Sequence, residues 1–318
     1  MKQQHSGSHC RLESLLTMHL VSLHRAVYRV VPQSVRARLK DSIPFGVQRF
    51  PLFLPDGQVL LLDHLDASKI LRRFAWKGIY GYEPDTIRLF YALAKRAKGV
   101  LDIGAYFGLY ALVAAKANPQ ASIHAFEPLP QNLVLLRHFL ELNRCEHVLV
   151  HPVAVAREVG EAILYIPKER RSALPATGSL KNRFRAGERF EGLNAQTAQV
   201  RTAPLDTLVK DAGIETVDLM KIDTEETEHQ VIQSGLTILE RFRPDLVMEI
   251  TFRDPHVSGA LAVLRDLNYL FFRIGPKGLT RFDEGDLAND KRTAAMNDLF
   301  HCEILCTCRS DSELPSYS

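Results

Sequence analysis

The sequence predicts an α/β fold in which a doubly wound, mostly parallel sheet carries helices on both faces. The first observation is that short apolar runs alternate with amphipathic stretches from residue 99 onwards, as in successive βα units. The second is that these apolar runs are uninterrupted, which is typical of parallel strands buried on both sides. The third is a glycine-containing turn, residues 104–108, that links one such run to a helix.

The elements of this alternation can be assigned in chain order. Residues 83–98 are expected to form a helix, because Pro84 suits a first turn. A long insert, residues 160–200, interrupts the alternation. The expected strands are 100–103, 123–126, 148–155, 217–222, 246–250, 269–274 and 300–306, and the expected helices are 109–117, 131–143, one ending near 241, and 257–267.

Residues 1–82 are expected to form an extension before the main domain. They comprise a polar, disordered start over residues 1–10, a basic helical region to about residue 40, and a short hairpin within residues 44–65. Residues 1–50 hold eight Lys and Arg against two Asp and Glu. Charged and histidine residues interrupt the apolar stretch 12–31, so a spanning helix is not expected. A helix packed on the domain is favoured over a membrane-surface helix, because the polar face has few cations.

Composition limits the remaining possibilities. The 318 residues are 46% hydrophobic and 24% charged, the balance of a globular protein. We therefore expect one catalytic domain over residues 83–308 and a tail over 309–318. The net charge of +3 is too small to indicate a nucleic-acid partner. The five cysteines show no paired spacing, which favours free thiols and a cytoplasmic location.

The segment VLDIGAYFG, residues 100–108, has the character of a ligand-binding turn. A buried strand ends near Asp102, and Gly104 and Gly108 flank a turn into a helix whose first N–H groups are free. Glycine suits this turn because a ligand would approach the backbone closely and a side chain would block it. The spacing D-x-G-x-x-x-G differs from the dinucleotide fingerprint G-x-G-x-x-G and suits a smaller nucleoside ligand. The alternative is a turn without a ligand.

A second strand end completes the predicted cradle. Residues 122–128, SIHAFEP, end in an acid about 20 residues after the glycines, where a carboxylate reaches ribose hydroxyls in such folds. The alternative is a solvated acid at a strand end. The residues expected to bind the cofactor are Asp102, Gly104, Ala105, Tyr106, Gly108, Glu127 and Pro128.

Acidic residues follow two further strands. Within DLMKIDTEETEH, residues 218–229, helix capping, catalysis and a metal site formed by Asp223, Glu225 and His229 are all open, and the metal is the least favoured. Glu249, at the end of PDLVMEI, is a candidate base or substrate ligand, with a solvated acid as the alternative. The catalytic candidates are therefore Asp223, Glu225 and Glu249, and no metal is predicted.

The insert is rich in basic residues. It would suit a lid over an anionic acceptor, although a solvated variable loop is favoured. Its basic residues are Lys168, Arg170, Arg171, Lys181, Arg183, Arg185 and Arg189.

The order of these motifs resembles that of the FkbM family of methyltransferases over about residues 83–273. The segments concerned are VLDIGAYFGLYALVAA, HAFEPLPQNLVLLRHFLELN, PLDTLV, VDLMKIDTEETEHQVIQSG and PDLVMEI. The resemblance implies a class I, Rossmann-like fold with a seven-stranded sheet whose last strand is antiparallel. It also implies S-adenosyl-L-methionine as cofactor and O-methylation of a hydroxyl, often on sugars or polyketides. The matching residues are Asp102, Gly104, Gly108, Glu127, Asp206, Lys221, Asp223, Glu225 and Glu228.

Two positions depart from the family pattern. Tyr106 stands where the family usually has Asn, and Glu226 where it usually has Gly. If that Gly has a positive φ, Glu226 is strained or its turn is rebuilt. We therefore expect an O-methyltransferase for a small-molecule or glycan acceptor, with a catalytically degenerate nucleoside-binding module as the alternative. The glycine spacing disfavours a dinucleotide-dependent oxidoreductase, and the oligomeric state stays open.

Overall fold

A computed structural model describes residues 19–167, 178–180, 195–251, 254–283 and 301–317. The start of the chain, over residues 1–10, and the basic side chains of the insert lie outside these ranges. Within them, no helix has both the length and the apolarity needed to cross a membrane. The chain divides into two compact units, the first built mainly from residues 1–84 and the second beginning at Asp85.

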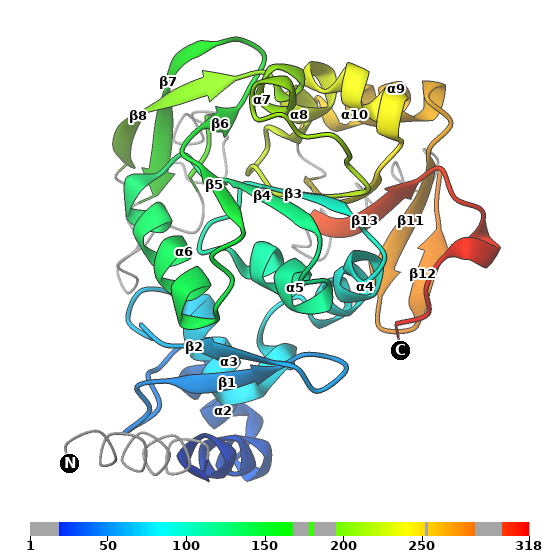
Figure 1. Cartoon of the computed structure of the whole chain (residues 1–318). Helices are drawn as coiled ribbons and strands as arrows, with labels where there is room; N and C mark the ends of the chain where they lie inside the picture. The colour runs from blue at the N-terminus through cyan, green and yellow to red at the C-terminus, as the bar shows by residue number, and fades with distance from the viewer. Residues whose placement is uncertain (1–18, 168–177, 181–194, 252–253, 284–300, 318) are drawn as a thin grey trace, which may run out of the picture. The chain divides into compact units, whose positions relative to one another are not determined.

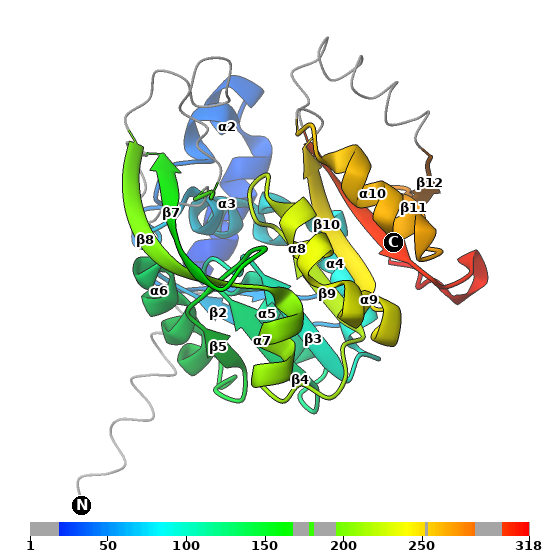
Figure 2. The ribbon, with the colours of Figure 1, turned by 90° about the horizontal axis from the view of Figure 1, so that it is seen from above.

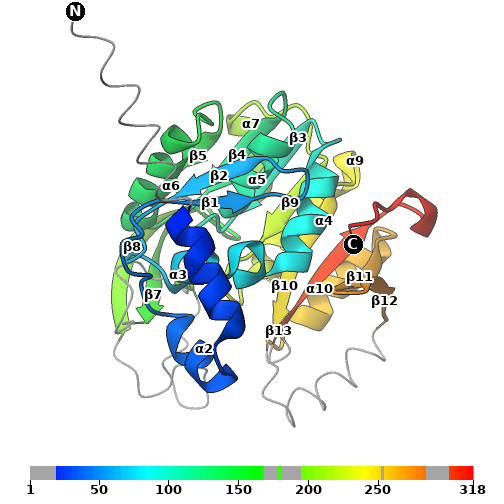
Figure 3. The same ribbon diagram turned by 90° about the horizontal axis from the view of Figure 1, so that it is seen from below.

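The described residues of the first unit form three α-helices, one short 3₁₀ helix and one strand pair. Residues 19–30 are helical and are followed by α2 (Gln33–Leu39), α3 (Lys69–Lys77) and the short 3₁₀ helix η1 (Gly78–Gly81). Strands β1 (Phe50–Phe53) and β2 (Val59–Leu62) pair antiparallel where the sequence predicts a hairpin (Figure 3). The indole of Trp76 packs on the rings of His24 and Tyr28.

The second unit is built on one large sheet in the order β12-β11-β13-β10-β9-β3-β4-β5 (Figure 1). The five strands from β10 to β5 are parallel to one another, and β13 is antiparallel to both of its neighbours. This confirms the α/β fold with an antiparallel last strand, and β12 adds an eighth strand. The bounds are β3 (Gly99–Ile103), β4 (Ser122–Phe126), β5 (Leu149–His151), β9 (Leu219–Ile222), β10 (Asp245–Thr251), β11 (Leu270–Gly275), β12 (Gly278–Arg281) and β13 (His301–Thr307).

Helices cover both faces of this sheet, as Figures 1 and 2 show. One face carries α4 (Pro84–Ala94), α5 (Leu109–Ala117) and α6 (Pro130–Leu142), and the other carries α7 (Leu205–Asp211), α8 (Glu228–Ser234), α9 (Leu236–Phe242) and α10 (Val257–Asp266). Every residue of β3 and β9 is buried, which explains their mainly apolar sequences; the charged exceptions are Asp102 and Lys221.

Two predicted elements were wrong in extent. The single helix expected to end near residue 241 is two helices, α8 and α9, which meet at Gly235. A Cβ at Gly235 would lie 2.6 Å from Leu205 Cδ2, so the chain approaches α7 closely at this break. The strand expected over 148–155 is also two strands, β5 and β6 (Ala154–Val155). Pro152 lies between them and has no N–H with which to continue the hydrogen bonds of β5.

The ends of the insert form strands that the sequence did not predict. Strand β7 (Gly160–Pro167) pairs antiparallel with β8 (Ala195–Ala203), and β6 joins β8 to make a separate three-stranded sheet. β8 has the largely polar sequence AQTAQVRTA, which lacks the apolar pattern of a buried strand.

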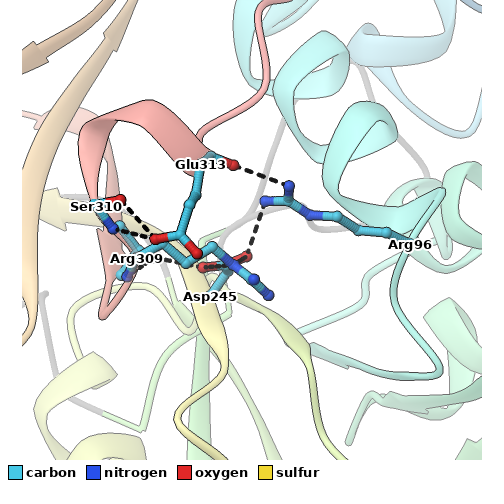
Figure 4. A network of polar contacts seen from close by, with 6 residues as sticks. Arg96, Asp245, Arg309, Ser310 and Glu313 are labelled. Carbon is cyan, nitrogen blue, oxygen red and sulfur yellow. Dashed lines mark hydrogen bonds and ion pairs between the residues drawn. The ribbon is translucent and has the colours of Figure 1, made fainter.

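The C-terminal residues are anchored to the main sheet by a network around Asp245 (Figure 4). The buried carboxylate of Asp245 accepts hydrogen bonds from Arg309 Nε at 2.9 Å and Thr307 Oγ1 at 2.6 Å. Arg96 lies 3.7 Å from the same carboxylate and donates to the carbonyl of Glu313. The predicted tail 309–318 is therefore fixed at its beginning to β10, β13 and the segment after α4.

Candidate functional site

A cavity of about 60 Å³ lies where β3, β4 and β9 end. The carboxyl edge of parallel strands is where α/β sheets bind ligands. Six of the predicted site residues line it, namely Gly104, Tyr106, Glu127, Pro128, Asp223 and Glu225. Asp102, Ala105, Gly108 and Glu249 do not. The sequence did not single out the other lining residues, which are Ile103, Phe126, Leu129, Asn132, Val153, Ala154, Val155, Leu164, Gly178, Leu180, Thr224 and Thr227.

The two glycines of the turn are required by contacts within the protein. Gly104 has a φ of +81°, and a Cβ there would lie 1.9 Å from the carbonyl oxygen of Asp223. Gly108, with a φ of +83°, begins α5, and a Cβ there would lie 3.0 Å from Leu136 Cγ. The sequence argument that a ligand excludes a side chain here was therefore incomplete, because the neighbouring backbone already excludes one at Gly104.

Tyr106 adopts the left-handed conformation that suits the Asn usual at this position. Its φ is +52°, a region that tyrosine rarely enters and Asn enters more readily. The Tyr106 N–H donates to Glu127 Oε2 at 2.8 Å. This charge-assisted hydrogen bond compensates the strain and ties the turn after β3 to the end of β4.

Glu127 is buried, and its carboxylate accepts hydrogen bonds from three donors within the protein. Its Oε2 accepts from Tyr106, and its Oε1 accepts from the Leu129 N–H at 2.8 Å and from Asn132 Nδ2 at 3.2 Å. Burial raises the pKa of Glu127 to about 7, against the lowering effect of these three hydrogen bonds. An ionised carboxylate offers about four acceptor positions, so one remains for a ligand hydroxyl.

Asn132 is a site residue that the sequence did not reveal. It lies in α6, is buried and lines the cavity beside Glu127. Its Nδ2 donates to Glu127, while its Oδ1 is buried without a hydrogen-bond partner among the described residues. A buried acceptor of this kind costs free energy unless a ligand or water donates to it. An Asn in the first turn of a helix is too common to have signalled this role.

Asp102 does not line the cavity but holds a helix beside it in place. Its buried Oδ2 accepts from the Ala111 N–H of α5 at 2.9 Å, so it holds the helix that follows the turn. Burial raises the pKa of Asp102 to about 7. Asp206 likewise holds the start of a helix, because its carboxylate accepts hydrogen bonds from the Thr237 and Ile238 N–H groups in the first turn of α9.

The acidic segment after β9 is organised by Glu228. Both Glu225 and Glu226 have positive φ, +57° and +75°, so Glu226 keeps the conformation that the family's glycine suggests and is strained. The buried Glu228 Oε1 accepts from the N–H groups of Thr224 at 2.9 Å and Glu226 at 3.2 Å. Burial raises the pKa of Glu228 to about 7, and the charge of Asp223 adds to this effect.

Asp223 is paired with a buried lysine that also contacts the last strand. Lys221 Nζ lies 3.5 Å from Asp223 Oδ2 and 3.4 Å from Glu303 Oε2, and its side chain is almost completely buried. Glu303 was missed because it meets β9 only through the antiparallel pairing of β13 with β10, which sequence periodicity does not encode. Asp223 is held by this lysine while part of its carboxylate remains accessible.

Glu249 lies on β10 directly opposite Glu303 on β13. Burial raises the pKa of Glu249 well above its usual value, the charges of Asp223, Glu225 and Glu303 add to this, and Lys221 opposes it. The sequence placed Glu249 with the catalytic residues. The structure places it next to the Asp223–Lys221–Glu303 group and outside the lining of the cavity.

The described side chains do not form the metal site considered for Asp223, Glu225 and His229. His229 is stacked on His256 at 4.4 Å, and its Nδ1 lies 3.6 Å from Asp254. The ligand atoms of Asp223, Glu225 and His229 do not gather within 4.8 Å of one another. This imidazole therefore faces the loop before α10.

Residues 178–180 of the insert border the cavity. Ser179 exchanges two backbone hydrogen bonds with Tyr165 of β7, and its Oγ donates to the carbonyl of Glu225 at 2.6 Å. Gly178 and Leu180, on either side, line the cavity. The insert thus contributes a wall to the site, while its basic residues lie outside the described ranges.

A family model and two known proteins each match part of this chain. The model of the methyltransferase FkbM domain matches residues 102–271. Methyltransferase sdnD of Sordaria araneosa is 27% identical over 154 residues, which is 42% of this chain and 59% of that protein. The synthetase AmbE of Pseudomonas aeruginosa is 29% identical over 198 residues, 53% of this chain and 9% of that protein. The chain thus spans less than two thirds of either relative.

The solved structures that match this chain include methyltransferase FkbM from Methylobacillus flagellatus KT. It is 13% identical, with a TM-score of 0.40, over 75% of this chain and 54% of that chain. The O-methyltransferase from Bacillus cereus, solved in complex with SAH, is 12% identical, with a TM-score of 0.40, over 71% of this chain and 82% of that chain.

Proposed function

The chain belongs to the FkbM methyltransferase family, and from this premise we propose that it transfers a methyl group from S-adenosylmethionine to a hydroxyl oxygen of a small-molecule or glycan acceptor. The observation that carries the proposal is the pair formed by Glu127 and Asn132. Two buried oxygen acceptors lie together, one just after the end of β4 and one in the first turn of α6, and the second, Asn132 Oδ1, has no donor among the described residues.

This pair fits the ribose of the cofactor. Two neighbouring hydroxyls would each find an acceptor, one on Glu127 Oε2 and one on Asn132 Oδ1. Apolar residues Leu129, Val153 and Leu164 line the same cavity and would contact the base. When bound, the cofactor supplies a methyl group already activated by its sulfonium.

Asp223 would accept the proton of the acceptor hydroxyl or orient that oxygen. It lines the cavity together with Glu225, at the end of a central strand. Lys221 Nζ lies 3.5 Å from one of its oxygens, a contact that favours one orientation of the partly exposed carboxylate. A hydroxyl attacks poorly until its proton is accepted, so a fixed carboxylate contributes by position and basicity.

The site must widen before a nucleoside enters. The cavity holds about 60 Å³, whereas ligand pockets usually hold about 300–1,000 Å³. The wall formed by residues 178–180 is held by three hydrogen bonds, two to Tyr165 and one to the carbonyl of Glu225. We infer that displacement of this segment accompanies cofactor binding.

Two measurements test the proposal. Calorimetry should show binding of adenosylhomocysteine and not of NAD, because the glycine turn lacks the dinucleotide spacing. Transfer of label from methyl-labelled S-adenosylmethionine to a panel of sugars and hydroxylated small molecules should then identify the acceptor class. Binding of adenosylhomocysteine without transfer to any acceptor would instead favour the degenerate binding module, and tighter binding of NAD would refute the assigned cofactor.

A further inference from the structure

The first unit contains a second cavity, of about 480 Å³, between the helix over residues 19–30, α2 and the end of α3. Its lining, as far as the described residues form it, combines positive charge with aromatic rings and contains no acidic residue. The lining residues are Arg25, Tyr28, Arg29, Gln33, Arg36, Ala37, Trp76, Lys77 and Tyr80. It accounts for part of the basic excess of residues 1–50.

Two of the four cations are fixed by neutral acceptors. Arg25 donates from Nε to the carbonyl of Ala75 at 3.1 Å, and from Nη2 to the carbonyls of Phe74 at 3.0 Å and Pro51 at 3.1 Å. Arg36 donates from Nε to the carbonyl of Val31 at 2.8 Å. Carbonyl oxygens orient these guanidinium groups without cancelling their charge.

The other two cationic side chains, Arg29 and Lys77, line the same cavity. Lys77 Nζ lies 5.7 Å from the centre of the Tyr28 ring, and Arg29 is exposed at the helix surface. Within the described part of the chain, none of the four forms an ion pair with an acid. Burial and, secondarily, the charge of Arg29 lower the pKa of Arg25 to about 10. The cavity therefore carries positive potential that an anion would relieve.

We propose that this cavity binds the phosphate group of an organic phosphate, either a soluble compound or a lipid headgroup. Guanidinium and ammonium groups are the usual partners of phosphate oxygens. Among the described residues Arg36 is held only through Nε, so its two terminal nitrogens could make a bidentate contact. A cavity of this size exceeds one phosphate group, so the carbon part would lie against Trp76 and Tyr80. None of these residues lines the methyl-transfer cavity, and the proposal is independent of it.

The test uses inorganic phosphate, phenyl phosphate and two kinds of vesicle, one of phosphatidylcholine alone and one of equal parts phosphatidylcholine and phosphatidic acid. Trp76 is the single tryptophan of the chain, so its fluorescence reports on the cavity directly. Calorimetry measures the soluble probes and co-sedimentation measures the vesicles. The full chain is compared with the double variant Arg29→Gln, Lys77→Gln and with Arg38→Gln, an exposed position of α2 outside the lining.

We expect a phosphate probe to bind and to change the Trp76 emission. In the double variant its affinity should fall about tenfold or more, the scale of a lost charged hydrogen bond, whereas Arg38→Gln should change it by less than about twofold. Binding of phenyl phosphate indicates a soluble ligand, and binding of the phosphatidic acid vesicles alone indicates a lipid. Adenosylhomocysteine affinity should be equal in all three proteins. The proposal is overturned if no phosphate probe binds, or if Arg38→Gln loses as much affinity as the double variant.

Discussion

Replacing Glu127 by glutamine removes one negative charge from the predicted ribose site and keeps the size of the side chain. Three of about four acceptor positions on the carboxylate are used inside the protein, by Tyr106, Leu129 and Asn132. The variant would therefore lose one charge-assisted hydrogen bond to the ligand, about 1.5–3 kcal/mol. We expect adenosylhomocysteine to bind about 10- to 150-fold more weakly at pH 8.

The pH dependence makes this prediction specific. Burial raises the pKa of Glu127 to about 7 from the usual 4.5. Ionisation thus opposes folding, and this contribution to the free energy of unfolding falls as pH rises from about 4.5 to about 7. Ligand binding has the opposite sign, because ribose hydroxyls donate to the ionised carboxylate. Wild-type affinity should rise between pH 6 and pH 8, and Glu127→Gln should lack this increase.

Calorimetry with adenosylhomocysteine at both pH values measures the effect. The matched control is Glu141→Gln, an exposed position on the same helix as Asn132, which should bind within about twofold of wild type. The reasoning fails if Glu127→Gln binds normally at pH 8. It fails equally if its loss of affinity is the same at pH 6, because the effect would then not come from the carboxylate charge.

Four further substitutions test other parts of the site. Asp223→Asn should lower kcat by about 10²–10⁴-fold with nearly unchanged adenosylmethionine affinity, and chelator should not reproduce this loss; near wild-type turnover would remove Asp223 from catalysis. Gly104→Ala should destabilise the protein by more than about 1 kcal/mol in chemical unfolding, because its Cβ meets the Asp223 carbonyl at 1.9 Å; unchanged stability would contradict that contact. Ser179→Ala removes the 2.6 Å bond to Glu225 and should tighten adenosylhomocysteine binding by a few-fold, on the order of 1 kcal/mol, whereas weaker binding would show that the wall supports the ligand. Glu226→Gly should raise the free energy of unfolding by about 1 kcal/mol, since φ is +75° there, and a loss of stability would mean that the Glu226 side chain outweighs the strain.

Periodicity predicted the parts of the fold that depend on local sequence. The turn from β3 into α5 was located within a residue, because a buried strand, two glycines and an apolar helix follow one another directly. Pro152 was visible in the sequence, and its missing N–H could have indicated the break between β5 and β6. Gly235 was visible too, yet the break between α8 and α9 involves the close approach to Leu205 of α7. β8 was missed because a strand that pairs mainly within a small sheet needs little apolar character.

The site residues also divide into those that the local sequence reveals and those whose role depends on contacts in the folded chain. Glu127, Asp223 and Glu225 were found because the ends of parallel strands meet at one edge. Asn132 was missed because an Asn in the first turn of a helix is too common to signal its contact with Glu127, five residues earlier. Glu303 was missed because its partner, the buried Lys221, lies on a strand remote in sequence. Glycine at residues 104 and 108 was assigned to ligand access, whereas the structure shows that backbone and side-chain neighbours also require it.

The two departures from the family pattern have one structural explanation. Tyr106 and Glu226 both occupy positive-φ positions where Asn and Gly are easier. In each case a buried carboxylate accepts the strained residue's N–H, Glu127 for Tyr106 and Glu228 for Glu226. The backbone geometry of both loops is therefore kept at a cost in stability, and the residues that keep it are acids at the edge of the sheet. For this reason the two substitutions do not by themselves argue for lost catalysis, since Asp223 and Glu225 still line the cavity.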